Sequence, residues 1–249
     1  MLNASAPATT LVIGNRNYSS WSLRAYLMVQ HCELPWTEIR LPLDTDTFER
    51  RIGELSPTRR VPVLRVGPTT IWDTLAIAEY LAERFPSLWP EDAAARGFAR
   101  CISAEMHAGF LPLREQMPMS CRARDRQVPI TAELSADIAR VEQIWSEGTQ
   151  RFAGHGPWLC GEFSAADCMY APVAFRFRTY GVAPSGRAGA YLERLLGHPE
   201  MIAWDEAARG ESEVIEAAEV GRNGSRARRP EVGTTDTSLA GRGDPDANR

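Results

Sequence analysis

The chain has 249 residues, of which 44% are hydrophobic and 24% are charged, close to the average of globular proteins. This length suits one large domain or two ordinary ones, and the composition excludes a wholly disordered, collagen-like or disulfide-scaffold protein. The formal net charge of -4 argues against a nucleic-acid partner, because such proteins present a basic face.

The sequence gives no indication of a membrane. No apolar run approaches the roughly 20 residues that a membrane-spanning helix needs, and the short run Leu11–Ile13 has no arginine before it. We therefore expect neither a signal peptide nor an anchor. The cysteines form no CxxC pair and lie in or beside apolar stretches, as buried thiols do in a reducing compartment. The five are Cys32, Cys101, Cys121, Cys160 and Cys168. A cytoplasmic protein is expected.

Residues 9–86 alternate short apolar runs with helical periods. The expected strands are Thr10–Ile13, Trp36–Leu41, Val61–Val66 and Thr69–Trp72, and the expected helices are Ser20–Cys32, Thr45–Leu55 and Asp73–Phe85. This order predicts a mixed sheet covered by helices, the thioredoxin-like layout of an α/β domain.

The strand signal vanishes after residue 86. Residues 87–93 read as a linker, and residues 94–220 are expected to form an all-α helical bundle. Its expected helices are Ala93–Met117, Thr131–Phe152, Ser164–Arg178, Arg187–Leu196 and Met201–Ala218. Residues 1–8 are predicted to be a flexible N-terminus. The segment 221–249 lacks aromatic residues and is predicted to be a disordered tail, because it cannot offset the entropy of ordering.

Ser19-Ser20-Trp21-Ser22-Leu23-Arg24 stands at the junction of the first strand and the first helix. A helix N-terminus presents unpaired N–H groups and a partial positive charge, so it favours an anion. A hydroxyl at this place can also donate to a thiolate. A simple helix cap explains the same residues, and the motif alone leaves both interpretations open.

Two further motifs have the same ambiguity. Pro62, inside a predicted strand, is either an edge-strand proline or part of a cis Val61–Pro62 bond that exposes the Val61 backbone to a peptide-like ligand. Asp73 and Thr74 open a helix directly after a strand. They serve either as a plain cap or as holders of a carboxylate or ammonium group.

A fourth motif, in residues 158–172, is assigned to folding. Ser164 and Asp167 have the spacing of a capping box, and Phe163 is placed as the hydrophobic staple.

Taken in order, the four motifs resemble the glutathione transferase family over residues 9–220. The hexapeptide that starts at Ser19 looks most like the zeta class, a serine-type class that carries SSCSWR there and includes maleylacetoacetate isomerases. The zeta motif has a second Arg where this chain has Tyr26. The absence of a Cys at position 19 argues against an omega-type thiol reductase.

The resemblance implies a role for each matching residue. Ser19 would hydrogen-bond the glutathione sulfur, with Ser20 as the neighbouring candidate and Tyr18 as a weaker one. Val61 would pair its backbone with the cysteinyl amide, with Pro62 cis.

At the other end of the ligand, Asp73 and Thr74 replace the family's Glu-Ser, which grips the γ-glutamyl group. Arg60 is the neighbouring candidate for holding a carboxylate.

The free-energy requirement for activating the thiol is modest. A thiol of pKa ~8.5 is only about 3% thiolate at pH 7, and lowering that pKa by ~2 units requires about 2.7 kcal/mol. One hydrogen bond to a charged group contributes roughly 1.5–3 kcal/mol, and a helix N-terminus roughly 0.3–1. Ser19 as a donor, together with the helix end, is therefore sufficient without a general base.

The sequence thus predicts an enzyme that joins glutathione, its co-substrate, to a small hydrophobic electrophile that the sequence does not name. Met106, His107, Phe110 and Met117 are candidate walls for it, although such a stripe is more often core. The histidines lack metal-ligand spacing, so no metal is expected. The family implies a homodimer. One alternative is a maleylacetoacetate-type cis–trans isomerase, which releases glutathione unchanged. Another is a non-catalytic glutathione-binding or regulatory protein.

Overall fold

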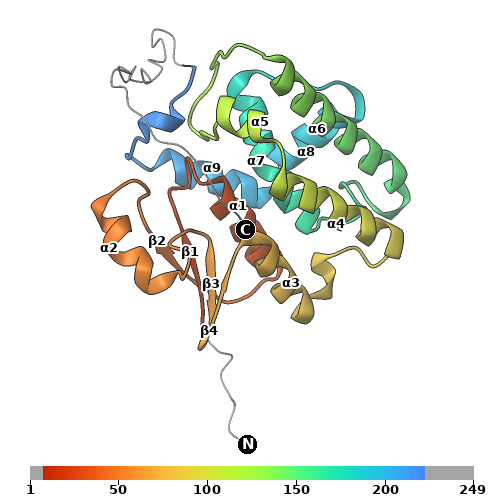
Figure 1. Cartoon of the computed structure of the whole chain (residues 1–249). Coiled ribbons are helices and arrows are strands. Elements are labelled where there is room, and N and C mark those ends of the chain that lie inside the picture. Colours follow the sequence, from red (N-terminus) through yellow and green to blue (C-terminus); the bar gives the residue numbers. More distant parts are fainter. Residues whose placement is uncertain (1–7, 222–249) are drawn as a thin grey trace, which may run out of the picture.

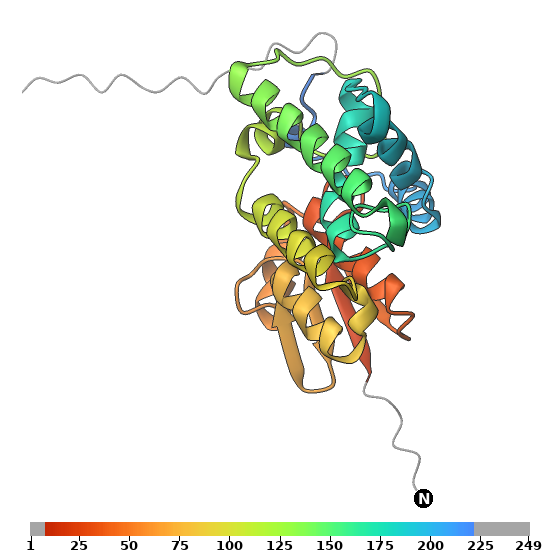
Figure 2. The same ribbon diagram turned by 90° about the vertical axis from the view of Figure 1, so that its right-hand side faces the viewer.

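The computed structural model describes residues 8–221. Figure 1 shows a sheet domain at the N-terminal end of the chain and a domain of helices beside it. Figure 2, turned by 90°, shows the helices that follow residue 93 gathered over one side of the sheet domain. The predictions of a flexible N-terminus and a disordered tail fall outside the described residues, apart from Ala8 and Gly221.

Four strands form the predicted mixed sheet. They are β1 (Thr9–Ile13), β2 (Thr37–Arg40), β3 (Val63–Val66) and β4 (Thr69–Trp72). The strand order is β2-β1-β3-β4, with β1 parallel to β2 and antiparallel to β3, and β3 antiparallel to β4. This order is the thioredoxin-like layout, so the expected fold class of the N-terminal domain is confirmed.

Alternation along β1 divides the core of the sheet domain in two, because successive side chains point to opposite faces. Val12 packs with Phe48 and Ile52 of α2 (Asp46–Leu55) on one face. Leu11 and Ile13 face the other side and join the large core under α1 (Ser20–His31) and α3 (Thr74–Arg84). The helical domain therefore packs on the same face as α1.

The second domain is entirely helical in the described residues. Its α-helices are α4 (Ala93–Ala108), α5 (Leu111–Gln116), α6 (Ala132–Arg151), α7 (Ala165–Tyr180), α8 (Gly186–Leu196) and α9 (Pro199–Arg209). Short 3-10 turns occur at Pro86–Leu88, Ala153–His155 and Glu216–Ala218. The central helix α7 is buried along almost its whole length and packs against α1, α4 and α8. Trp145 of α6 contacts α7 through the Tyr170 and Phe177 rings.

Two of the expected helices are wrong in extent. The helix predicted over Ala93–Met117 is two helices, because Gly109 ends α4 and Phe110 adopts a left-handed backbone (φ 59°) before Leu111 begins α5. The helix predicted over Met201–Ala218 ends at Arg209.

Two local expectations also need correction. Pro62 precedes β3 rather than lying inside a strand, while the expected cis Val61–Pro62 bond is present. Cys101 is exposed, whereas the other four cysteines are buried as predicted.

The segment after α9 lies across the β1–α1 loop. The Glu211 carboxylate accepts hydrogen bonds from the backbone N–H groups of Arg16 (2.8 Å) and Asn17 (3.0 Å). The Glu219 carboxylate accepts from the Tyr18 hydroxyl at 2.6 Å. Gly210 ends α9 as its C-cap, and the contacts of Glu211 and Glu219 hold the loop that leads into Ser19.

Candidate active site

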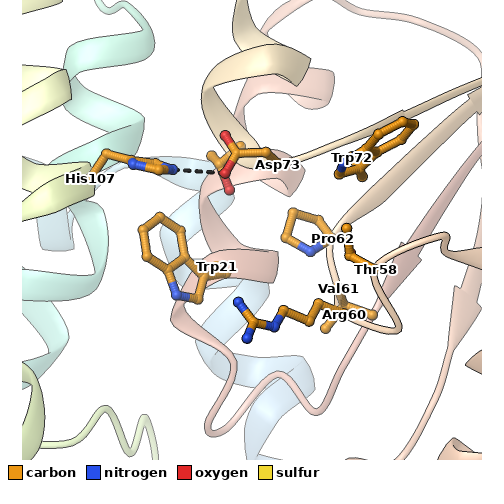
Figure 3. A pocket seen from close by; sticks show the side chains of 9 residues that line it. Trp21, Thr58, Arg60, Val61, Pro62, Trp72, Asp73 and His107 are labelled. Carbon is orange, nitrogen blue, oxygen red and sulfur yellow. Dashed lines mark hydrogen bonds and ion pairs between the residues drawn. The ribbon is translucent and has the colours of Figure 1, made fainter. Parts of the chain in front are cut away.

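A cavity of about 240 Å³ opens between the sheet domain and α4 (Figure 3). Its walls come from the first turn of α1, the loop before β3, the β4–α3 junction and α4. The lining residues are Trp21, Thr58, Arg60, Val61, Pro62, Trp72, Asp73, Thr74 and His107. Four segments of the chain therefore meet at one place.

This cavity brings together five of the seven residues singled out from the sequence. Arg60, Val61 and Pro62 line it from the loop before β3, and Asp73 and Thr74 line it from the start of α3. Ser19 and Ser20 do not line it.

The start of α3 presents two polar side chains to the cavity. Asp73 is the N-cap and has a left-handed backbone (φ 71°), and its Oδ1 accepts from the Leu75 backbone N–H at 2.9 Å. Its Oδ2 lies 2.8 Å from Nε2 of His107 (Figure 3). The Thr74 hydroxyl is buried and has no hydrogen-bond partner among the described residues. Since buried hydroxyls are normally paired, this atom is suited to a ligand.

The start of α1 is satisfied internally. The Ser19 hydroxyl accepts from the Ser22 backbone N–H at 3.3 Å and donates to the Ser22 hydroxyl oxygen at 2.7 Å. That oxygen also accepts from the Gly14 backbone N–H at 3.0 Å. Ser19 therefore acts as a helix cap in this conformation, and its hydroxyl must turn away from Ser22 to reach a ligand.

Tyr18 is bound away from the cavity. Its hydroxyl donates to Glu219 and accepts from Arg122 at 3.2 Å. Burial and the neighbouring Glu219 raise the pKa of Tyr18. Both effects favour the neutral phenol in a structural role.

Sequence reasoning did not assign the other four lining residues to the glutathione site, and it named one of them, His107, only as a candidate wall for the electrophile. Trp21, Thr58 and Trp72 flank predicted site residues, and that proximity was the available signal. His107 was the polar member of the Met/Phe stripe on α4, and its ring lies edge-on to Trp21 with centroids 5.3 Å apart. The other members of that stripe, Met106, Phe110 and Met117, are buried in the core, as the simpler interpretation of the stripe predicts.

The cavity carries both signs of charge. Arg60 and Asp73 line it from different elements, so it can receive a ligand that has an anionic and a cationic end. In the part of the chain that the structure describes, no group of three or more His, Cys, Asp or Glu side chains is placed to hold a metal ion.

Comparison with known proteins assigns the family. The N-terminal domain family of glutathione S-transferases matches residues 18–84, and the C-terminal domain family matches residues 123–206. Mouse maleylacetoacetate isomerase is 33% identical over 164 residues, which span 64% of this chain and 74% of that protein. The chain belongs to the glutathione S-transferase family. This membership confirms the resemblance found in the sequence and the expectation of a glutathione-dependent enzyme.

Two more similarities describe the range of proteins related to this chain. A stringent starvation protein A homologue from Histophilus somni is 24% identical over 166 residues, 64% of this chain and 74% of that protein. Among solved structures, a glutathione transferase homologue from Burkholderia with bound glutathione aligns with a TM-score of 0.61 at 23% identity. That alignment covers 82% of this chain and 99% of the homologue, and it supports the fold of both domains. No described helix is long and apolar enough to cross a membrane.

Proposed function

We propose that this transferase binds glutathione in the cavity of Figure 3 and activates its thiol for attack on an electrophilic small molecule. The observation that carries the proposal is the Thr74 hydroxyl, which is buried without a hydrogen-bond partner among the described residues, in a cavity wall that also carries Arg60 and Asp73. Glutathione has an ammonium group, two carboxylates and backbone amides. A cavity lined by a carboxylate, a guanidinium and exposed backbone matches those groups in kind.

Each lining residue then has a chemical task. Asp73 attracts the γ-glutamyl ammonium group, and the Thr74 hydroxyl donates a hydrogen bond to the γ-glutamyl carboxylate. The backbone of Val61, held beside Pro62, pairs with the cysteinyl amide. Arg60 neutralises a carboxylate at the opposite end. These contacts place the cysteinyl sulfur toward the first turn of α1.

Ser19 is the proposed donor to the sulfur, with Ser20 as its neighbour. When the thiolate forms, the Ser19 hydroxyl donates its hydrogen bond to the sulfur instead of the Ser22 oxygen. The partial positive charge at the N-terminus of α1 adds to this stabilisation. A charged acceptor forms the stronger hydrogen bond, so the exchange favours the anion. The thiol proton leaves to solvent. The thiolate then forms a carbon–sulfur bond to the electrophile, and the displaced group leaves with its bonding electrons.

The test is calorimetric titration of glutathione into wild type, Ser19→Ala and Ser22→Ala, with the pKa of the bound thiol followed by ultraviolet absorbance. We expect saturable binding in all three and a thiol pKa near 6–7 in wild type, about 2 units below that of a free thiol. The value should rise in Ser19→Ala only. If the pKa of the bound thiol is the same in Ser19→Ala as in wild type, Ser19 only caps the helix. Absence of glutathione binding in wild type would refute the proposal.

The similarity to maleylacetoacetate isomerase supports a second candidate activity. In that reaction the thiolate adds to the substrate, a bond rotates, and the carbon–sulfur bond breaks to release glutathione. Product analysis separates the two activities, because an isomerised product retains no glutathione. Tight glutathione binding with no turnover of any electrophile would instead support the non-catalytic alternative.

A further inference from the structure

The β1–α1 loop, residues 14–19, is bonded to distant parts of the chain through two of its central residues. Arg16 donates its backbone N–H to Glu211 (2.8 Å), and its carbonyl accepts from the Trp204 indole N–H at 2.9 Å. Asn17 donates its N–H to the same Glu211 carboxylate (3.0 Å), and its carbonyl accepts from the Cys121 N–H at 3.1 Å. All four backbone polar groups of Arg16 and Asn17 are therefore paired outside the loop.

The Glu211 carboxylate divides its two oxygens between the two N–H groups. Oε1 accepts from Arg16 and Oε2 from Asn17, across 195 and 194 positions of sequence. Hydrogen bonds to an ionised acceptor are roughly twice as strong as those between neutral groups, and Glu211 is buried, where water competes less for its oxygens. The carboxylate therefore holds two successive peptide units of the loop firmly.

Two arginines hold Glu211 in place. Arg40 Nη1 lies 3.4 Å from Glu211 Oε1, which offsets part of the cost of burying the carboxylate. Arg122 donates to the backbone carbonyls of Glu211 and Glu213. Arg122 also donates its own backbone N–H to the side-chain oxygen of Asn17 at 2.9 Å. The segment after α9, blue in Figure 1, and the loop are thus bound to each other and to a common third segment.

Arg16 and Asn17 belong to the turn that precedes Ser19. The Asn15 carbonyl accepts the backbone N–H groups of Tyr18 (3.3 Å) and Ser19 (2.8 Å), so it closes a turn with Arg16 and Asn17 inside. Ser19 follows directly and caps α1. The position of Ser19 therefore depends on a turn whose inner N–H groups are bound by Glu211 and not by β1 or α1.

A role in forming α9 does not explain Glu211. The residue follows Gly210, the C-cap of that helix, so its side chain is not required to complete the helix. The nearby Glu213 shows the contrast, because its carboxylate pairs with Arg40 at 2.8 Å and forms no hydrogen bond to the loop within residues 8–221. What the Glu211 carboxylate stabilises is the conformation of the loop.

The conformation of this loop matters for the chemistry proposed above. The Ser19 hydroxyl has to reach the glutathione sulfur at hydrogen-bond distance, and a misplacement of about 1 Å caused by a distant residue can cost roughly 100-fold in rate. A donor is effective when the residues behind it hold it in place before the ligand arrives. Glu211 is suited to that task because it binds the peptide units next to Ser19 without lining the cavity.

We propose that Glu211 is a positioning residue for Ser19. It holds the β1–α1 loop so that the Ser19 hydroxyl stands where it can donate to the thiolate. The assignment rests on the proposed function, because Glu211 acts through Ser19 and does not contact glutathione. The segment after α9 thereby contributes to thiol activation from outside the cavity.

The pKa of glutathione's thiol in the complex, followed by ultraviolet absorbance, tests the proposal. Glu211→Gln keeps an acceptor for one of the two N–H groups and loses the other, so we expect the pKa of the bound thiol to rise by about 1 unit. The loss of a negative charge by itself would lower that pKa, so a rise separates positioning from long-range electrostatics. Glu213→Gln removes one charge from the same segment and is the matched control, which should not raise the pKa.

S-methylglutathione and the Ser19→Ala background show whether the effect passes through Ser19. S-methylglutathione has no thiol, so its Kd, measured by calorimetric titration, should be the same in Glu211→Gln and wild type. In Ser19→Ala, adding Glu211→Gln should cause no further rise in the thiol pKa, because the group that Glu211 positions is already absent.

Other results would overturn the assignment. They are an unchanged or lower thiol pKa in Glu211→Gln, a weaker affinity for S-methylglutathione, and an equal rise of the thiol pKa with and without Ser19. If the thiol pKa does not respond to Ser19→Ala, or if wild type binds no glutathione, the proposed function fails, and this inference fails with it. A response to Ser19→Ala but not to Glu211→Gln rejects the inference alone. Glu211→Asp, which keeps the charge but is one CH₂ shorter, replaces Glu211→Gln if that variant does not fold, and it should also raise the thiol pKa.

Discussion

The starts of α1 and α3 differ in what their polar side chains contact. Each helix follows a strand and begins with a capping residue, Ser19 in α1 and Asp73 in α3. The Ser19 hydroxyl is used within its own turn, where it both donates to and accepts from Ser22. At the start of α3 the Thr74 hydroxyl has no hydrogen-bond partner within residues 8–221, and one Asp73 oxygen faces the His107 side chain of the other domain.

The difference separates capping from binding. A cap satisfies the orphan N–H groups of its own helix, and a residue that does only this need not meet a ligand. The α3 junction keeps polar atoms beyond those that the cap requires. The start of α7 is a third case, in which Asp167 accepts from Leu159, Ser164 and Tyr191 and meets no cavity residue.

The largest expected effect is at α7. Asp167→Ala leaves the Leu159 and Ser164 N–H groups and the Tyr191 hydroxyl unpaired in the core, and we expect a loss of about 3–5 kcal/mol in the free energy of unfolding. Urea denaturation measures it. The glutathione affinity of the folded fraction should stay at the wild-type value. A loss below about 1 kcal/mol would show that the capping box contributes little to this fold.

Asp167 also makes the free energy of unfolding depend on pH. Burial raises the pKa of Asp167 to about 6, despite the hydrogen bonds that it accepts. The folded chain then binds more protons than the unfolded chain between about pH 4 and 6, so this contribution to stability is present below pH 4 and is lost as the pH rises through 6. Compared with Asp167→Asn, wild type should lose about 3 kcal/mol of relative stability from pH 4 to 7. A difference in the free energy of unfolding between wild type and Asp167→Asn that stays the same at every pH would contradict this expectation.

At α3, removing the charge of Asp73 should weaken glutathione binding without unfolding the protein. Asp73→Asn keeps an acceptor for the Leu75 N–H but loses attraction for an ammonium group, so we expect the Kd to rise about 10- to 100-fold. Asp92→Asn is the matched control, because Asp92 caps α4 through the Ala95 N–H in the same way and lies outside the cavity. Equal losses of affinity in both variants would mean that the effect came from capping.

The smallest expected effect is at Thr74. Thr74→Val keeps the shape and removes the unpartnered hydroxyl, so the Kd for glutathione should rise about fivefold while stability stays level or increases by about 1 kcal/mol. Thr179→Val should instead lower the stability and leave the Kd for glutathione unchanged, because the Thr179 hydroxyl donates to the Ser120 carbonyl at 2.8 Å in the core. An unchanged Kd in Thr74→Val would remove this hydroxyl from the site.

The sequence was informative about the site because its segments carry local signals. The starts of α1 and α3 were both identified from capping residues after a strand, and the loop before β3 from Pro62. Local signals could not show which starts share a cavity. His107 was left out of the predicted site because a histidine in an apolar stripe most often packs, and its contact with Asp73 joins residues 34 positions apart.

The sequence by itself determined the strand and helix order, the mixed sheet, the two domains and the family, because periodicity and capping are properties of neighbouring residues. Tertiary structure decided where α4 ends, that Glu211 and Glu219 bind the segment after α9 to the β1–α1 loop, and that the Ser19 hydroxyl is directed toward Ser22. It also brought the guanidinium groups of Arg24 and Arg114 onto the Trp21 ring. These outcomes depend on which side chains from distant segments compete for the same donors and charges, and no local pattern records that competition.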